Sequence, residues 1–135
     1  MRSKAPLLLM EQMIMLLVFA LAAALCLQAF ALSDGLSRRS EARDRAVTLA
    51  QTAAETIRHQ GGAPESALNR AAGALGGRYE NGVLTLTRGE GEETLTLTAR
   101  PVPTEVPGLA KAAIRVERQG EVLFEIEAAW QEVAV

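Results

Sequence analysis

The sequence predicts an α+β protein in which one long N-terminal helix packs on a four-stranded antiparallel meander. Residues 13–32 form an uncharged, almost wholly apolar run, long enough as a helix to cross the roughly 30 Å hydrocarbon core of a bilayer. Apolar residues then recur at helical spacing as far as Gly61,. Beyond Gly77 the apolar period changes to two, which is typical of strands with one buried face.

Composition narrows the function classes. The formal net charge is −2, with 14 Lys and Arg against 16 Asp and Glu. No basic stripe with interleaved aromatic residues occurs, so we expect no nucleic-acid partner. Cys26 is the single cysteine, so no intrachain disulfide can form,. Roughly 75 residues remain for a globular part, which is near the lower limit for an independent core. We therefore expect the preceding helix to provide one wall of that core.

The N-terminus divides into a basic leader, residues 1–6, and a transmembrane helix, residues 7–32. Pro6 suits the first turn of a helix. A secretory signal peptide also begins this way, and residues 29–31 (AFA) offer a small-x-small cleavage site,. A retained anchor is favoured, because Glu11 lies inside the apolar region and the apolar run exceeds a typical signal core,.

Residues 33–60 continue the helix in amphipathic form. Apolar residues recur on one face of this helix and charged residues occupy its other faces. The helical spacing of the apolar residues ends at Gly61 and Gly62,. Gly35 is the one position where we would allow a kink. The predicted core-facing stripe comprises Ala46, Leu49, Ala50, Ala53 and Ile57. We expect it to cover Leu84, Leu86, Ile114, Phe124 and Ile126 of the sheet.

Residues 61–135 are predicted to form a small helix and the sheet. The helix opens at Pro64 and ends at Gly76,. In the first hairpin, a four-residue turn over residues 89–92 separates the two strands. The matched apolar faces then pair Leu86 with Leu95, Leu84 with Leu97 and Arg88 with Glu93,.

The second hairpin is predicted to turn through Arg118, Gln119 and Gly120, with Gly120 in the left-handed conformation of a bulged turn,. This turn pairs Val116 with Val122 and Ile114 with Phe124. A two-residue turn would place Leu123 opposite Val116 and break the match between apolar faces. Between the hairpins, the proline-rich residues 101–108 predict an exposed, extended loop,.

This layout, with residues 4–30 (KAPLLLMEQMIMLLVFALAAALCLQAF), resembles the type IV pilin-like family, which includes the type II secretion pseudopilins. The resemblance implies leader cleavage between Pro6 and Leu7 and matches Glu11 to the glutamate that follows the cleavage site. Pro6 departs from the family pattern, which has glycine there. The resemblance also implies that Glu11 pairs with the N-terminal amine of a neighbouring subunit. A carboxylate in a low dielectric requires such a partner.

The remaining candidate residues favour structural interpretations. Leu25 precedes Cys26 where a lipoprotein cysteine needs a small residue, so Cys26 is interpreted as a small apolar filler,. His59 has no second histidine or cysteine pair to form a metal site with it,. The acidic residues Glu121, Glu125 and Glu127 are predicted to form a solvated strand face opposite Lys111 and Arg115. No catalytic constellation is evident, so we expect no enzyme, no metal and no cofactor.

The sequence thus favours a structural pilin-like membrane subunit of a type IV pilus or type II secretion-type pseudopilus. Its partners would be membrane lipid, other pilin-like subunits and their assembly machinery, with oligomers forming through the N-terminal helix. The alternative is a single-pass membrane protein with a small extracytoplasmic binding domain and no filament. A secreted module released by signal peptidase comes third.

The orientation in the membrane rests on the resemblance, which implies a cell-membrane protein with its C-terminal domain outside the cytoplasm. The positive-inside rule alone points the other way. Four arginines, Arg38, Arg39, Arg43 and Arg45, follow the span, against only Arg2 and Lys4 before it.

Overall fold

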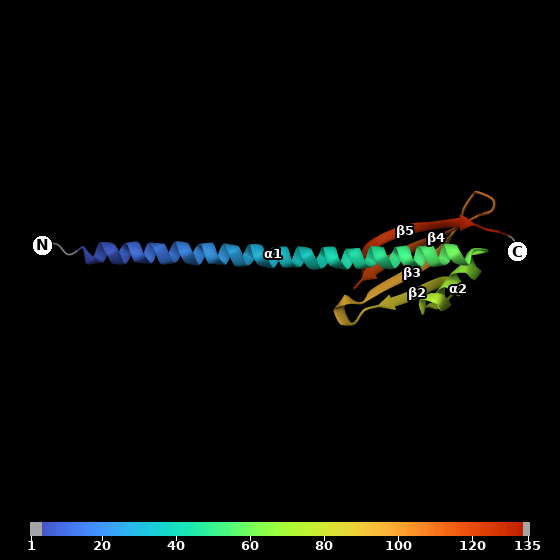
Figure 1. Cartoon of the computed structure of the whole chain (residues 1–135), viewed down its shortest axis with the longest axis horizontal. Coiled ribbons are helices and arrows are strands. Elements are labelled where there is room, and N and C mark those ends of the chain that lie inside the picture. The colour runs from blue at the N-terminus through green and yellow to red at the C-terminus, as the bar shows by residue number, and fades with distance from the viewer. Residues whose placement is uncertain (1–3, 134–135) are drawn as a thin grey trace. The chain divides into compact units, whose positions relative to one another are not determined.

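The computed structural model describes residues 4–133, so Met1, Arg2 and Ser3 of the predicted leader lie outside the described residues. Helix α1 (Ala5–Gln60) is followed by α2 (Pro64–Leu75) and an antiparallel sheet (Figure 1). Contacts divide the chain into two compact units, Met1–Ser40 and Glu41–Val135. The predicted α+β class, with one long N-terminal helix, is confirmed.

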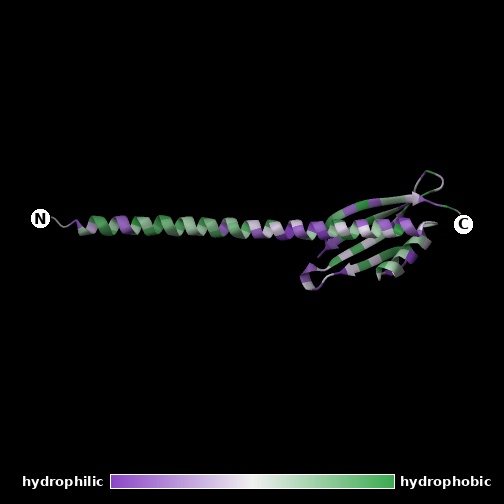
Figure 2. Cartoon of the chain, viewed as in Figure 1, coloured by the Kyte–Doolittle hydropathy of each residue, from purple (hydrophilic) through white to green (hydrophobic). Residues whose placement is uncertain are grey.

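In the first unit, α1 is apolar and exposed. Every large apolar side chain from Leu7 to Leu36 is exposed, from 56% at Ile14 to 78% at Phe30. The apolar stretch is visible in Figure 2 as the green half of the helix. The helix continues without interruption through Gly35. By length and composition it can cross a membrane near its N-terminus.

The second unit contains five strands, one more than predicted, in the order β1-β2-β3-β4-β5. Their bounds are β1 Arg78–Glu80, β2 Val83–Arg88, β3 Leu95–Val102, β4 Leu109–Arg118 and β5 Glu121–Gln131. The additional strand is β1, whose three residues are too few to show an apolar period. It joins β2 through Asn81 and Gly82, both at positive φ, and Asn-Gly is itself a strong signal for a tight hairpin.

The predicted register of the β2–β3 hairpin is wrong by two residues. Leu86 pairs with Leu97, Leu84 with Ala99 and Arg88 with Leu95. The connection is longer than the predicted four-residue turn, because it includes the 3-10 helix η1 (Gly91–Glu93). A shift of two preserves the side-chain alternation, so the leucines still face the core.

The β4–β5 hairpin differs in its turn and its register. Arg118 pairs with Glu121, so the turn has two residues, Gln119 and Gly120, both at positive φ as a type I′ turn requires,. A bulge between Val116 and Glu117 then places Val116 opposite Phe124 instead of Val122, and Ile114 pairs with Ile126. The bulge restores the match of apolar faces that the turn alone would lose. The left-handed conformation of Gly120 is confirmed.

The predicted loop over residues 101–108 begins later than expected, because β3 continues through Pro101 to Val102. Pro101 pairs with Ala112 of β4. Strand β2, however, pairs with β3 only as far as Ala99. At Pro101, β3 is therefore an edge strand, where proline is tolerated.

The core lies between the inner face of the sheet and the two helices. The predicted α1 stripe is confirmed: Ala46, Ala50, Ala53 and Ile57 are fully buried and Leu49 is half-buried. The largest side chains buried with Ile57 are Leu68, Leu84, Leu86, Leu97, Ile114 and Val116. Phe124 and Ile126 pack on this cluster but remain partly exposed. Strand β5 is attached at its end by the Trp130 indole N–H, which donates to the Gly62 carbonyl at 2.9 Å.

Candidate functional site

Glu11, Pro6 and Leu7 all lie on α1, and all three are exposed. Leu7 and Glu11 are four residues apart, so they lie one turn apart on one helix face. Pro6 occupies the first turn, where its missing N–H costs no helical hydrogen bond,. At about 1.5 Å rise per residue, the Cα atoms of Leu7 and Glu11 lie about 6 Å apart along the helix axis.

Glu11 is the one formally charged side chain between Lys4 and Asp34. Its neighbours along the helix, Leu7, Leu8, Met10 and Met15, are all exposed apolar side chains. Removing such a surface from water would leave the carboxylate in a low dielectric, where it needs a cation or hydrogen-bond donors. A lone charged group of this kind can fix the register between packed helices.

A second feature of the helix surface is a set of small residues, Ala20, Ala22, Ala23 and Ala24. Ala20 and Ala24 are one turn apart, and small residues at this spacing let membrane helices approach closely. Cys26 lies just beyond them and is exposed as a free thiol.

Sequence reasoning missed a groove in the second unit, with a volume of about 500 Å³. Its apolar lining comes from Leu49 of α1, Leu75 of α2, Leu86 of β2 and Leu95 of β3. Its polar lining comprises Glu41, Asp44, Arg45, Thr48, Thr52, Arg88 and Glu93. These residues are up to 54 positions apart in the sequence (Glu41 to Leu95), so no local pattern could have identified the groove.

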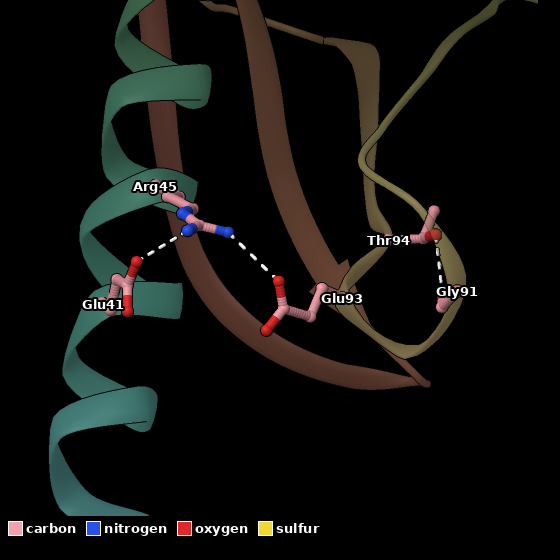
Figure 3. Close-up of polar contacts among 5 residues, drawn as sticks. All are labelled: Glu41, Arg45, Gly91, Glu93 and Thr94. Atoms are coloured by element: carbon pink, nitrogen blue, oxygen red, sulfur yellow. Dashed lines mark hydrogen bonds and ion pairs between the residues drawn. The ribbon is translucent and has the colours of Figure 1, made fainter. Parts of the chain in front are cut away.

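Arg45 connects the two sides of this groove (Figure 3). Its guanidinium donates to Glu41 Oε1 at 2.6 Å on the same helix and to Glu93 Oε2 at 3.3 Å in η1. The η1 turn is itself closed by Thr94 Oγ1, which donates to the Gly91 carbonyl at 2.8 Å. All three charged side chains are more than half exposed, so the ion pairs contribute about 0–1 kcal/mol each. Of the two, only the Arg45–Glu93 pair joins α1 to η1.

The outer face of the sheet holds the predicted acidic residues. Arg115 pairs in register with Glu125, and their side chains lie 3.6 Å apart, as predicted. The other predicted opposition is wrong, because Lys111 pairs with Ala129 and Glu127 with Ala113. Glu121, Glu125 and Glu127 are all exposed, which fits a solvated face. Arg115 also lies 3.7 Å from Glu117.

His59 is exposed in the last turn of α1. Among residues 4–133, no group of three or more His, Cys, Asp or Glu side chains could hold a metal ion. The candidate sites are therefore the helix surface around Glu11 and the groove beside Arg45. No protein-family model, curated protein or solved structure matches this chain significantly.

Proposed function

We propose that this chain is a structural, pilin-like membrane subunit of a type IV pilus or type II secretion-type pseudopilus, which assembles through its N-terminal helix. The supporting observation is the division of α1. Its first 36 residues, Ala5–Ser40, are exposed and mostly apolar, whereas residues 46–57 form a buried wall of the antiparallel unit. An exposed apolar helix needs lipid or other apolar helices around it.

Glu11 is proposed to determine the register of that assembly. After cleavage between Pro6 and Leu7, the amine of Leu7 in one subunit would pair with Glu11 in the next. Both groups would then be satisfied in an apolar environment that penalises either alone. This role needs cleavage at the Pro6–Leu7 bond, and sequencing the N-terminus of the mature protein tests that directly.

The proposed location is the cell membrane, with residues 33–135 outside the cytoplasm. Protease added to intact spheroplasts should then digest the sheet while a fragment containing α1's apolar half stays with the membrane. Full protection of the sheet would refute the orientation, and alkaline extraction of the chain would refute the anchor.

The assembly is tested by cross-linking between copies at the native Cys26 thiol, with a bis-maleimide reagent in membranes. Glu11→Leu should lower the cross-linked fraction while the amount of inserted monomer holds, because an apolar residue inserts at least as well as a carboxylate. Glu11→Gln should be intermediate, since it keeps a hydrogen bond but loses the charge. Gln12→Leu is the matched control, because it removes a neighbouring polar group but not the carboxylate.

An uncleaved chain whose cross-links are unchanged in Glu11→Leu would contradict this proposal.

The groove beside Arg45 supports the second candidate, a single-pass membrane protein with a small extracytoplasmic binding domain and no filament. Its lining combines four leucines with charged and hydroxyl side chains, and small-molecule sites likewise combine apolar walls with polar groups. That candidate predicts no Cys26 cross-links between copies in any of the variants.

A further inference from the structure

The sheet of the second unit has two edge strands, and they differ greatly in length. Strand β1 supplies 3 residues to one edge, whereas β5 supplies 11 residues to the other. An edge strand presents unpaired N–H and C=O groups along its free side, and a very short edge strand offers few of them. Strand β5 is therefore the edge at which another strand can be added.

The free side of β5 is regular over its last eight residues. Phe124–Gln131 pairs with β4 residue by residue, because the bulge lies before Phe124. Within residues 4–133, no backbone hydrogen bond outside the pairing with β4 reaches Phe124–Trp130. Figure 1 shows β5 at the margin of the sheet. The strand contains no proline, lysine or arginine, the residues that commonly block an edge,. An extended segment can therefore bind here through main-chain hydrogen bonds.

The inner face of the sheet beside this edge favours apolar side chains in the added strand. Phe124 and Ile126 pack on the core but remain partly exposed. Their partners on β4, Val116 and Ile114, are fully buried. A strand added next to β5 would cover the exposed parts of Phe124 and Ile126, and this cover is favourable when the inward side chains of the added strand are apolar.

The outer face beside the same edge is acidic. Glu125 and Glu127 are both exposed there. Glu125 lies 3.6 Å from Arg115, whereas Glu127 pairs in register with Ala113 and forms no ion pair with any residue from 4 to 133. Like charges on neighbouring strands are destabilising and opposite charges are stabilising. The glutamates therefore oppose pairing with β5 of a second copy and favour a strand that carries basic side chains.

We propose that β5 binds an extended segment of another protein in which apolar residues alternate with lysine or arginine. The segment adds to the five-stranded sheet along Phe124–Gln131. Its apolar side chains lie beside Phe124 and Ile126, and its basic side chains lie beside Glu127. The main-chain hydrogen bonds supply affinity, and the alternation of side chains supplies specificity. This site uses only the second unit, so it does not depend on the proposed assembly through the N-terminal helix.

Peptide binding to the full-length chain tests the proposal, in phosphatidylcholine nanodiscs that hold one copy each. The probe is a fluorescein-labelled peptide that alternates valine and lysine and has the length of Phe124–Gln131, with empty nanodiscs as the background. We expect a saturable rise in anisotropy, and slower hydrogen exchange of the β5 amides in the bound state. A peptide that alternates valine and glutamate should bind at least about tenfold more weakly, because its charge is reversed. A peptide with all valines before all lysines should be weakened similarly, because it has no apolar face.

Glu127→Lys should weaken binding of the valine–lysine peptide by about tenfold or more and should strengthen binding of the valine–glutamate peptide, because it reverses the charge beside the edge. Glu80→Lys is the matched control, because it makes the same charge change at an exposed position on β1, the other edge strand. It should leave the binding of both peptides unchanged.

Three results would overturn the proposal. The first is the absence of saturable binding by the valine–lysine peptide. The second is equal affinity for the three peptides, or equal effects of Glu127→Lys and Glu80→Lys. The third is slow exchange of the β5 amides without peptide in nanodiscs that hold two copies but not in those that hold one, since a second copy would then occupy the edge.

Discussion

Removing the second half of α1 should prevent the sheet from folding. A chain that begins at Gly61 keeps α2 and all five strands but loses Ala46, Ala50, Ala53 and Ile57, which are fully buried. Five large, fully buried side chains of the sheet then lose cover: Leu84, Leu86, Leu97, Ile114 and Val116. Exposing each one fully costs about 1.5–3 kcal/mol, so even half exposure of the five costs about 4–8 kcal/mol.

That cost is comparable to the entire stability of so small a domain, which is about 4–11 kcal/mol for about 75 residues. We expect the shortened chain to be molten or aggregated. A chain that begins at Ser33 retains the buried wall and should unfold cooperatively in urea. Fluorescence of Trp130 is a suitable probe, because its hydrogen-bond partner Gly62 is present in both chains. Similar cooperative urea midpoints for the two chains would refute the view that α1 is part of the core.

Three further predictions use the chain that begins at Ser33, with urea denaturation as the measurement. Ile57→Ala should lower the free energy of unfolding by about 2–5 kcal/mol through the cavity it leaves. Val122→Ala is the control, at a side chain that is 44% exposed, and should change the free energy of unfolding by less than about 0.5 kcal/mol. Equal effects of the two substitutions would contradict the burial of Ile57. Gly77→Ala should destabilise the folded chain, because the new Cβ would lie 2.7 Å from the Thr85 carbonyl oxygen. Gly73→Ala, in open space on α2, should instead stabilise the folded chain by about 0.5–1 kcal/mol. A loss of stability in Gly73→Ala would contradict the open space around Gly73. Arg115→Ala breaks two exposed ion pairs and should cost at most about 1 kcal/mol, so a larger loss would mean that the outer sheet face is not simply solvated.

The helices could be predicted from the sequence because their signals are local. The apolar run, the stripe through Ala46 and Ile57 and the stops at Gly61 and Gly76 are each contained within a few turns. The matching of apolar faces also predicted correctly which side of each of the four predicted strands faces the core. Both hairpin registers were wrong, however, because alternation fixes a face and not a residue pair. A shift of two, as at Leu86, satisfies the same pattern,.

The groove and the hydrogen bond between Trp130 and Gly62 could be identified only from the folded structure. The groove joins Arg45 of α1 to Glu93 of η1 across 48 residues, and the Trp130 indole reaches Gly62 across 68. Neither contact has a spacing that a sequence can reveal. Strand β1, in contrast, could have been predicted from the sequence, because Asn81 and Gly82 are a recognisable signal for a hairpin turn,.

The order of the sheet, β1-β2-β3-β4-β5, has a kinetic consequence. Each strand pairs with the strand made immediately before it, so a chain synthesised from its N-terminus always has a finished neighbour ready for the next strand. Such local pairing lowers the entropic cost of closing loops and favours rapid folding. The hydrogen bond from Trp130 to Gly62 joins residues 68 positions apart, which is farther than the 48 positions between Arg45 and Glu93. We expect it to form last, so the burial of that indole should mark the end of the folding reaction.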